Sequence, residues 1–219
     1  MAHILNIETA TTNCSVSLSK NGETLVLKED NNLKYSHAET LHVFIEQALK
    51  EANLNTKELD AIAVSKGPGS YTGLRIGVSA AKGLCFALEK PLISIPTLQS
   101  LAFQIKDFEG LIIPLLDARR MEVYSAVYNS KYCEERKTLA EIINQDSFKE
   151  YLELGTVNFI GPGVEKTQKE INHKNAVFVE DKLPSAREMS VLSYKKYKQH
   201  LYEDVAYFEP YYLKDFIAL

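Results

Sequence analysis

The stretch that decides the fold runs from residue 65 to residue 88 and reads SKGPGSYTGLRIGVSAAKGLCFAL. It has three glycines within seven positions, Gly67, Gly69 and Gly73, and then continues as a helix-like run. The apolar segment DAIAVS at 60–65 precedes the glycines and is typical of a buried strand. A glycine-rich turn between a strand and a helix is a common arrangement for holding a phosphate. The stretch predicts an α/β unit and raises the question of what its glycines do.

The glycine pattern does not match the common phosphate-binding fingerprints. Thr72 stands where a dinucleotide-binding motif needs its third glycine, and no Gly-Lys-Ser or Gly-Lys-Thr follows at the Walker spacing. After the turn, small residues recur on one helix face, which lets another element approach closely. We therefore interpret the glycines as serving turn geometry and packing first and phosphate binding second.

Composition and charge narrow the class of protein. The chain has 219 residues, of which 45% are hydrophobic and 25% charged, as in ordinary soluble globular proteins. Its net charge of −4 argues against gripping nucleic acid through its own surface. The N-terminus is polar within nine residues, and no apolar run approaches the length of a membrane span, so we expect a cytoplasmic protein. Three scattered cysteines predict neither a disulfide framework nor a zinc site.

The chain shows one order of elements twice. Its first half predicts strands at 3–8, 14–20 and 23–28, with Asn21-Gly22 as a hairpin turn, and then a helix opened by a capping box at 36–39. Next come a strand at 60–65, the Gly-Pro-Gly turn and a helix to 88, and after these a strand at 92–95 and a helix at 97–105. The second half repeats this with strands at 111–117, 121–128 and 133–139, a helix at 146–154, a second Gly-Pro-Gly at 161–163 and a final helix at 185–200. We predict two similar α/β lobes, 1–105 and 106–219, with coincidence as the alternative.

Two lobes that each open with an acid-ended strand, a turn and a second strand follow the plan of the actin-like ATPase (ribonuclease H-like) fold. In that fold a nucleotide lies between the lobes, and the two turns grip its phosphates. The hydroxyls of Thr9, Thr11 and Thr12 could bind phosphate oxygens, and Glu8 and Asp117 could hold magnesium through water. The same residue types also make ordinary turns. Ala10 and Arg119 replace the glycines expected for close approach, so nucleotide binding stays open and efficient hydrolysis is not expected.

Four segments together resemble one family: ILNIETA at 4–10, GPGSYTGLR at 67–75, KPLI at 90–93 and DARRMEVY at 117–124. They resemble the TsaB (YeaZ) family of bacterial tRNA threonylcarbamoyladenosine biosynthesis proteins, in the glycoprotease-like branch of the actin-like (ASKHA) fold. The resemblance runs from residue 4 to PYYL at 210–213. It implies two actin-like α/β lobes and a role in modifying the adenosine next to the tRNA anticodon.

The resemblance also implies a subunit without chemistry of its own. The related catalytic subunit, TsaD, holds a metal through a His-x-x-x-His pair, and Thr97 and Leu101 stand at those positions here. Neither side chain can replace an imidazole ligand. We expect no catalytic residue, no metal site and no required cofactor, with ATP or ADP at an inter-subunit site left open. The alternatives are an actin-like kinase or hydrolase and a residual glycoprotease-like peptidase.

The partners that the family implies are TsaD, the ATPase TsaE, and a second copy of the chain when it is alone, with tRNA met only in the complex. In the family the helices at about 36–52 and 72–88 form a bundle with TsaD. We therefore predict a partner interface made by Leu41, Ile45, Gly73, Gly77, Ala80, Ala81 and Leu84. The alternative is that these residues pack within their own lobe. Aromatic residues from Tyr207 to Phe216 are expected to pack the C-terminal tail onto the lobes.

Overall fold

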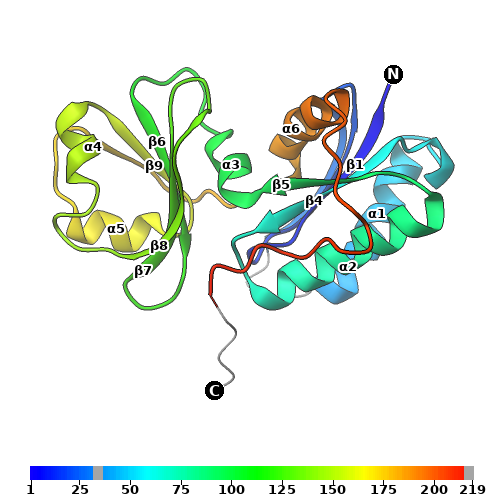
Figure 1. Ribbon diagram of the computed structural model, residues 1–219, viewed down its shortest axis with the longest axis horizontal. Helices are drawn as coiled ribbons and strands as arrows, with labels where there is room; N and C mark the ends of the chain where they lie inside the picture. Colours follow the sequence, from blue (N-terminus) through cyan, green and yellow to red (C-terminus); the bar gives the residue numbers. More distant parts are fainter. Residues whose placement is uncertain (32–36, 215–219) are drawn as a thin grey trace. The chain divides into compact units, whose positions relative to one another are not determined.

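The computed structural model describes residues 1–31 and 37–214. The chain forms two compact units, each built around a five-stranded sheet (Figure 1). Unit 1 comprises Met1–Ser100 together with the chain from Pro184 onward, and unit 2 comprises Leu101–Leu183.

The sheet of unit 1 has the strand order β3-β2-β1-β4-β5. Its antiparallel part is formed by β1 (His3–Glu8), β2 (Cys14–Lys20) and β3 (Glu23–Asp30). β4 (Ala61–Gly67) pairs in parallel with β1, and β5 (Leu92–Pro96) pairs in parallel with β4. Asn21 and Gly22 both have positive φ, 51° and 88°, as a tight hairpin turn requires.

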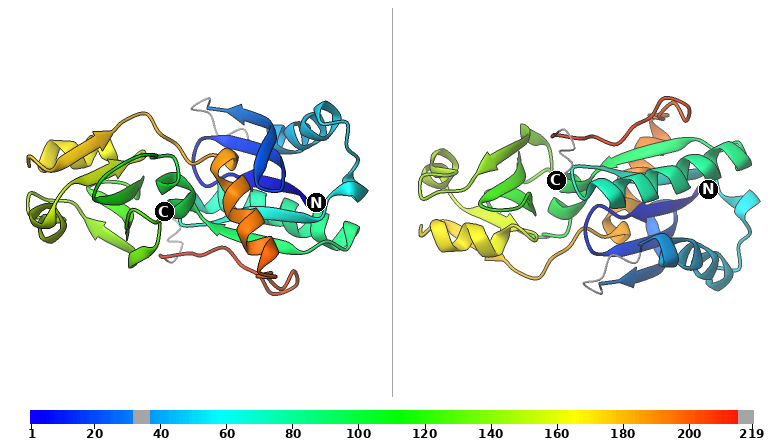
Figure 2. Two further views of the ribbon diagram at one scale, coloured as in Figure 1. Left: turned by 90° about the horizontal axis from the view of Figure 1, so that it is seen from above. Right: turned by 90° about the horizontal axis from the view of Figure 1, so that it is seen from below.

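Helices cover both faces of this sheet (Figure 2). α1 (His37–Glu51) packs on β2 and β3, and α2 (Tyr71–Leu88) packs on β4. α6 (Ala186–Lys198) packs on β1, β2, β3 and β5 from the opposite side. A short 3-10 helix, η1 (Thr56–Glu58), leads into β4. The capping box expected at 36–39 includes Ser36, which lies outside the described residues.

The two faces of β2 differ in chemistry. Cys14, Val16 and Leu18 belong to the hydrophobic core that includes α1 and α2. The intervening serines face α6, where the Ser17 hydroxyl donates to the carbonyl of Ala186 at 2.7 Å and the Ala186 N–H donates to Ser15 Oγ at 2.9 Å. These serines are buried. Their small side chains let α6 approach, and their hydroxyls satisfy buried polar groups.

Unit 2 repeats the topology of unit 1. Its strands are β6 (Leu111–Asp117), β7 (Glu122–Tyr128), β8 (Glu134–Ile142), β9 (Val157–Ile160) and β10 (Ala176–Val179). Their order, β8-β7-β6-β9-β10, again places an antiparallel three-strand meander beside two parallel strands. α4 (Lys149–Leu154) and α5 (Val164–Glu170) complete the repeat. The prediction of two similar actin-like lobes is confirmed.

The division of the chain differs from the predicted boundary between residues 105 and 106. We expected the helix at 185–200 in the second lobe, but this helix, α6, packs on the sheet of unit 1. The helix after β5 is α3 (Thr97–Ala102), whose six residues end before the expected residue 105. α6 covers the face of this sheet that carries the buried serines of β2.

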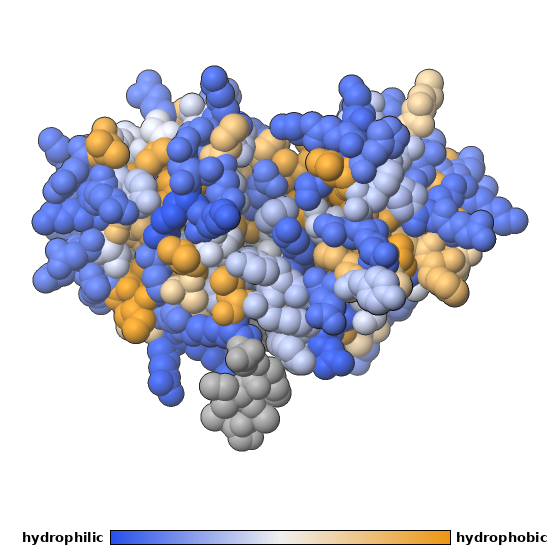
Figure 3. All heavy atoms as spheres, viewed as in Figure 1, coloured by the Kyte–Doolittle hydropathy of each residue, from blue (hydrophilic) through white to orange (hydrophobic). Residues whose placement is uncertain are grey.

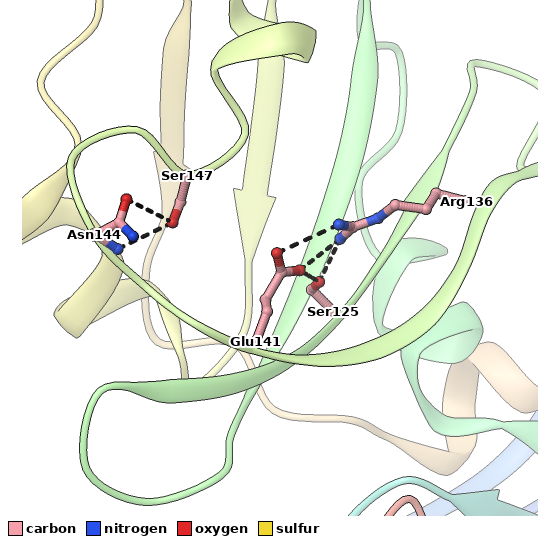
Figure 4. Close-up of polar contacts among 5 residues, drawn as sticks. All are labelled: Ser125, Arg136, Glu141, Asn144 and Ser147. Carbon is pink, nitrogen blue, oxygen red and sulfur yellow. Dashed lines mark hydrogen bonds and ion pairs between the residues drawn. The ribbon is translucent and has the colours of Figure 1, made fainter.

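A polar cluster ties β7 and β8 together in unit 2 (Figure 4). The guanidinium of Arg136 donates to Glu141 Oε1 and to Ser125 Oγ, both at 2.6 Å. It also lies 5.4 Å from the ring centroid of Phe148. Because desolvation offsets much of the attraction in such a partly buried ion pair, the pair by itself is weak evidence of added stability.

Candidate functional site

The turn between β1 and β2, residues 9–13, lies against the beginning of α2. We call it the β1–β2 turn. Thr9 is only 1% exposed, and its hydroxyl donates to the carbonyl of Gly73 at 2.8 Å. The N–H of Ser70 donates to the carbonyl of Ala10 at 2.7 Å. The turn is therefore joined to α2 by hydrogen bonds in both directions.

The glycines of the opening stretch make room for this turn. A Cβ on Gly73 would clash with the carbonyl oxygen of Thr9, and one on Gly77 would clash with Thr9 Oγ1. A Cβ on Gly69 would lie 2.5 Å from the carbonyl oxygen of Ala10, closer than real Cβ contacts. These three glycines serve close packing inside unit 1, which for Gly73 and Gly77 is the alternative to the predicted partner interface.

Glu8 holds the turn from behind. Its carboxylate is fully buried, and Oε1 accepts hydrogen bonds from the Ala10 N–H at 2.7 Å and the Ser65 hydroxyl at 2.8 Å. Among the described residues, Oε2 has no hydrogen-bond partner. Burial raises the pKa of Glu8 to about 7, although the hydrogen bonds from Ala10 and Ser65 oppose this shift. Glu8 is a structural acid whose neutral form is favoured by its surroundings.

Two further contacts fix the turn to other parts of unit 1. His37, at the beginning of α1, forms a hydrogen bond through Nε2 with the carbonyl of Thr11 at 2.7 Å. The side-chain amide of Asn13 donates through Nδ2 to the carbonyl of Pro184 at 2.9 Å, and Pro184 lies in the segment before α6. The turn therefore contacts α1, α2, β4 and the chain that enters α6.

The predicted phosphate-binding residues divide into two groups. Glu8 and Thr9 are buried and make hydrogen bonds within the fold, so they do not present themselves to a ligand. Thr11 and Thr12 are half-buried at the surface of the turn. Asp117 belongs to unit 2 and is exposed. Only the last three keep the accessibility that phosphate binding needs.

Asp117 shapes the β6–β7 turn. Its Oδ1 accepts hydrogen bonds from the Arg119 N–H at 2.6 Å and from Lys166 Nζ at 2.8 Å. Lys166 Nζ also donates to the carbonyls of Arg120 and Glu122, at 2.7 and 3.0 Å. Arg119 and Arg120 both have positive φ, 70° and 49°, and this lysine holds them in the left-handed conformation that their side chains disfavour.

The burial of the predicted interface residues corrects their placement on a partner-facing side. Five of the seven residues are buried inside unit 1: Leu41, Ile45, Gly73, Gly77 and Ala81. The other two, Ala80 and Leu84, are half-buried against the same core. The apolar and small stripe of a helix marks the face that meets its own sheet. The residues selected from that stripe therefore face the sheet of unit 1.

The outward face of α2 carries a different set of residues. Phe86 is 83% exposed, and a Cβ on Gly83 would meet nothing within 4 Å. Val43, on the outward side of α1, is 47% exposed. The sequence signal for this face is Phe86, a large apolar residue that lies off the apolar stripe of α2.

The C-terminal tail packs along α2, although Tyr207, one of the aromatic residues expected to pack, is 84% exposed. Lys82 Nζ donates to the carbonyls of Ala206 and Phe208, at 3.2 and 2.9 Å. The rings of Tyr71 and Tyr212 lie 5.0 Å apart. Phe216 was included in the same prediction and lies outside the described residues.

The positions that match the metal-binding histidines of TsaD are buried. Thr97 and Leu101 are both fully shielded from solvent, and the Thr97 hydroxyl lies 3.2 Å from Ser65 Oγ. Within residues 1–31 and 37–214, no group of three or more His, Cys, Asp or Glu side chains is arranged to hold a metal ion.

The surface and the helices add two observations. On the face drawn in Figure 3, hydrophilic residues predominate, and hydrophobic ones form small separate patches. None of the described helices is both long enough and apolar enough to cross a membrane.

The repeated topology and the acid-ended hairpins define a two-lobed protein of the actin-like α/β class. Residues 31–218 match the model of the family described as TsaD, tRNA N6-adenosine threonylcarbamoyltransferase, and the chain belongs to that family.

Relatives named TsaB and a relative named tRNA N6-adenosine threonylcarbamoyltransferase are both similar to this chain. The chain is 36% identical to the tRNA threonylcarbamoyladenosine biosynthesis protein TsaB of Bacillus subtilis over 128 residues, which is 58% of this chain and 56% of that protein. It is 28% identical to TsaB of Escherichia coli, covering 98% of this chain and 96% of that protein. YeaZ from Pseudomonas aeruginosa superposes with a TM-score of 0.81 at 25% identity, covering 97% of this chain and all of that one. The resemblance found in the sequence is confirmed.

The burial of Glu8 predicts a pH-dependent stability. Because the folded-state pKa is raised from 4.5 to about 7, the protonated form stabilises the fold below pH 4.5, and this contribution is lost as pH rises to 7. The loss amounts to about 3 kcal/mol in the free energy of unfolding. Urea unfolding of the wild type and Glu8→Gln over this pH range measures it, with Glu46→Gln, an exposed site on α1, as the control. Parallel pH profiles for the wild type and Glu8→Gln would contradict the assignment.

Replacing glycine by alanine should have opposite effects on stability at two positions of α2, Gly77 and Gly83. Gly77→Ala should lower the thermal midpoint, because the new Cβ meets Thr9 Oγ1. Gly83→Ala should raise the free energy of unfolding by about 0.5–1 kcal/mol, because its surroundings are open and alanine favours the helix. Thermal unfolding of both variants of the isolated chain compares them. Equal midpoints would show that Gly77 is not enclosed.

Proposed function

We propose that this chain is a non-catalytic subunit required for the threonylcarbamoyladenosine modification of tRNA at the adenosine next to the anticodon. The observation that carries the proposal is the likeness to TsaB proteins along almost the whole chain, combined with Thr97 and Leu101 at the positions of the metal-binding pair of TsaD. In this proposal the chain acts in the cytoplasm by binding and supporting TsaD, together with TsaE.

The chemistry of the candidate residues supports a binding role. Threonine and leucine offer no imidazole nitrogen to a metal. Glu8 and the Thr9 hydroxyl, which a nucleotide-processing site would need at its surface, make hydrogen bonds within the fold. An actin-like kinase or hydrolase is therefore less well supported. If ATP or ADP binds at a subunit interface, Thr11 and Thr12 are the residues of the β1–β2 turn that remain at the surface to meet its phosphates.

We place the contact with TsaD on the outward face of α2 and the neighbouring side of α1. Glycine in the middle of a helix costs roughly 0.5–1 kcal/mol relative to alanine, and Gly83 has no packing reason for it inside unit 1. A partner helix close to Gly83 would supply the reason, and Phe86 and Val43 would add apolar surface on either side. The same face would form the homodimer when TsaD is absent, and tRNA would meet the chain only within the complex.

Reconstitution of tRNA modification tests the role of the chain. The isolated chain should transfer no threonylcarbamoyl group, and leaving it out of an otherwise complete set of components should abolish or strongly reduce the modification. Adding the chain back should restore the activity. Undiminished modification in its absence would overturn the proposal.

The placement of the interface predicts a selective effect of Gly83→Leu. The larger side chain should crowd the partner helix by an amount similar to overpacking in a core, about 1–3 kcal/mol, and so weaken TsaD binding by roughly five- to 150-fold. The thermal midpoint of the isolated chain should not fall, because the space around Gly83 is open.

Binding of TsaD and thermal unfolding should be measured on one preparation. Lys195→Leu, which adds a leucine at an exposed position of α6, controls for a new apolar side chain. Unchanged affinity for Gly83→Leu would show that the interface lies on another face.

A further inference from the structure

The β1–β2 turn contacts both helices on which we place the partner surface, although the turn itself packs beneath them. Thr9 and Ala10 bond to the beginning of α2, and Thr11 bonds to the beginning of α1 through His37. Glu8 fixes the turn to β4.

Thr9 fits α2 at one position along the helix axis. Gly73 and Gly77 are four residues apart and therefore lie on one face, one above the other. The backbone of Thr9 occupies the space next to Gly73, and its side chain occupies the space next to Gly77. The neighbours of these glycines on the inward side are Leu74, Val78 and Ala81, whose side chains leave no comparable gap. A shift of α2 along its axis would drive Thr9 into one of them.

The hydroxyl of Thr9 adds a directional hydrogen bond to this steric fit. It donates to the carbonyl of Gly73 at 2.8 Å inside a site that excludes water, since Thr9 is 1% exposed. A helix is stiff over this distance, and Gly83 lies about 9 Å along the axis from Gly77. The contact on the inward face is therefore one of those that fix where Gly83 and Phe86 lie on the outward face.

We propose that Thr9 is a positioning residue for the partner surface: it sets the axial position of α2 through Gly73 and Gly77 without touching the partner. This inference rests on the proposed function, because the outward face of α2 is the surface that it positions. It assigns a role to a threonine that the sequence pattern had associated with phosphate.

Two substitutions separate the parts of the contact. Thr9→Val keeps the shape of the side chain and removes its hydroxyl, whereas Thr9→Ser keeps the hydroxyl and removes the methyl group. Thr12→Val, in the same turn but half-buried and without a hydrogen bond to α2 among the described residues, is the matched control. Hydrogen exchange of the amides at residues 73–77 in the isolated chain reports on the contact, and TsaD affinity reports on the surface.

For Thr9→Val we expect exchange at residues 73–77 to accelerate by about three- to tenfold, the value of one net hydrogen bond, and TsaD affinity to fall by a similar factor. Exchange in α6 should stay unchanged, which separates a local shift from global loss of stability. Thr9→Ser should restore both quantities towards the wild-type values, and Thr12→Val should alter neither.

The outcomes that overturn the proposal are distinct. Unchanged exchange in Thr9→Val would show that the hydroxyl does not hold α2. Faster exchange with wild-type affinity would show that the position of α2 does not matter to the partner. Failure of the wild type to bind TsaD would overturn the proposed function, and the positioning role with it, whatever the exchange data show.

Discussion

Unit 1 depends on one close fit, in which the β1–β2 turn occupies space that side chains on Gly69, Gly73 and Gly77 would fill. The fit brings α2 close to the sheet, orients the acid end of β1, and buries the carboxylate of Glu8 behind the turn. Glycine is required at these positions because other side chains would push the turn away. The same fit explains why a sequence that resembles a phosphate loop works as a packing surface.

Much of the fold could be predicted because its signals are local. The alternation of β2, the Asn21-Gly22 turn and the apolar segments before each Gly-Pro-Gly are read from a few neighbouring residues, and their repetition indicates two lobes. The placement of α6 could not be predicted in this way. The serines of β2 are compatible with either solvent or a helix on that face, and only the tertiary structure shows that α6 covers them.

In the candidate site, too, local sequence patterns predict some features and leave the tertiary contacts undetermined. Motifs at 67–75 and 117–124 led to the right family, because their residue types and order are specific. Small residues on α2 did not reveal their direction, since Gly77 packs against Thr9 and Gly83 faces open space although both are glycines in one helix. The threonines of the β1–β2 turn posed the same problem, because a hydroxyl that bonds to a phosphate and one that bonds to Gly73 look alike in sequence.

The most direct measurement of the central fit is a double-mutant cycle between Thr9 and Gly77, using Thr9→Ala, Gly77→Ala and the double variant in urea unfolding. In the double variant the new Cβ on residue 77 no longer meets an Oγ1, so much of the cost of Gly77→Ala should vanish. We predict that the double variant is more stable than the sum of the single effects by at least about 1 kcal/mol. If the two single-variant changes in the free energy of unfolding add to within about 0.5 kcal/mol, the account is contradicted. Additivity would show that the side chain of Thr9 does not occupy the space that a Cβ on residue 77 needs.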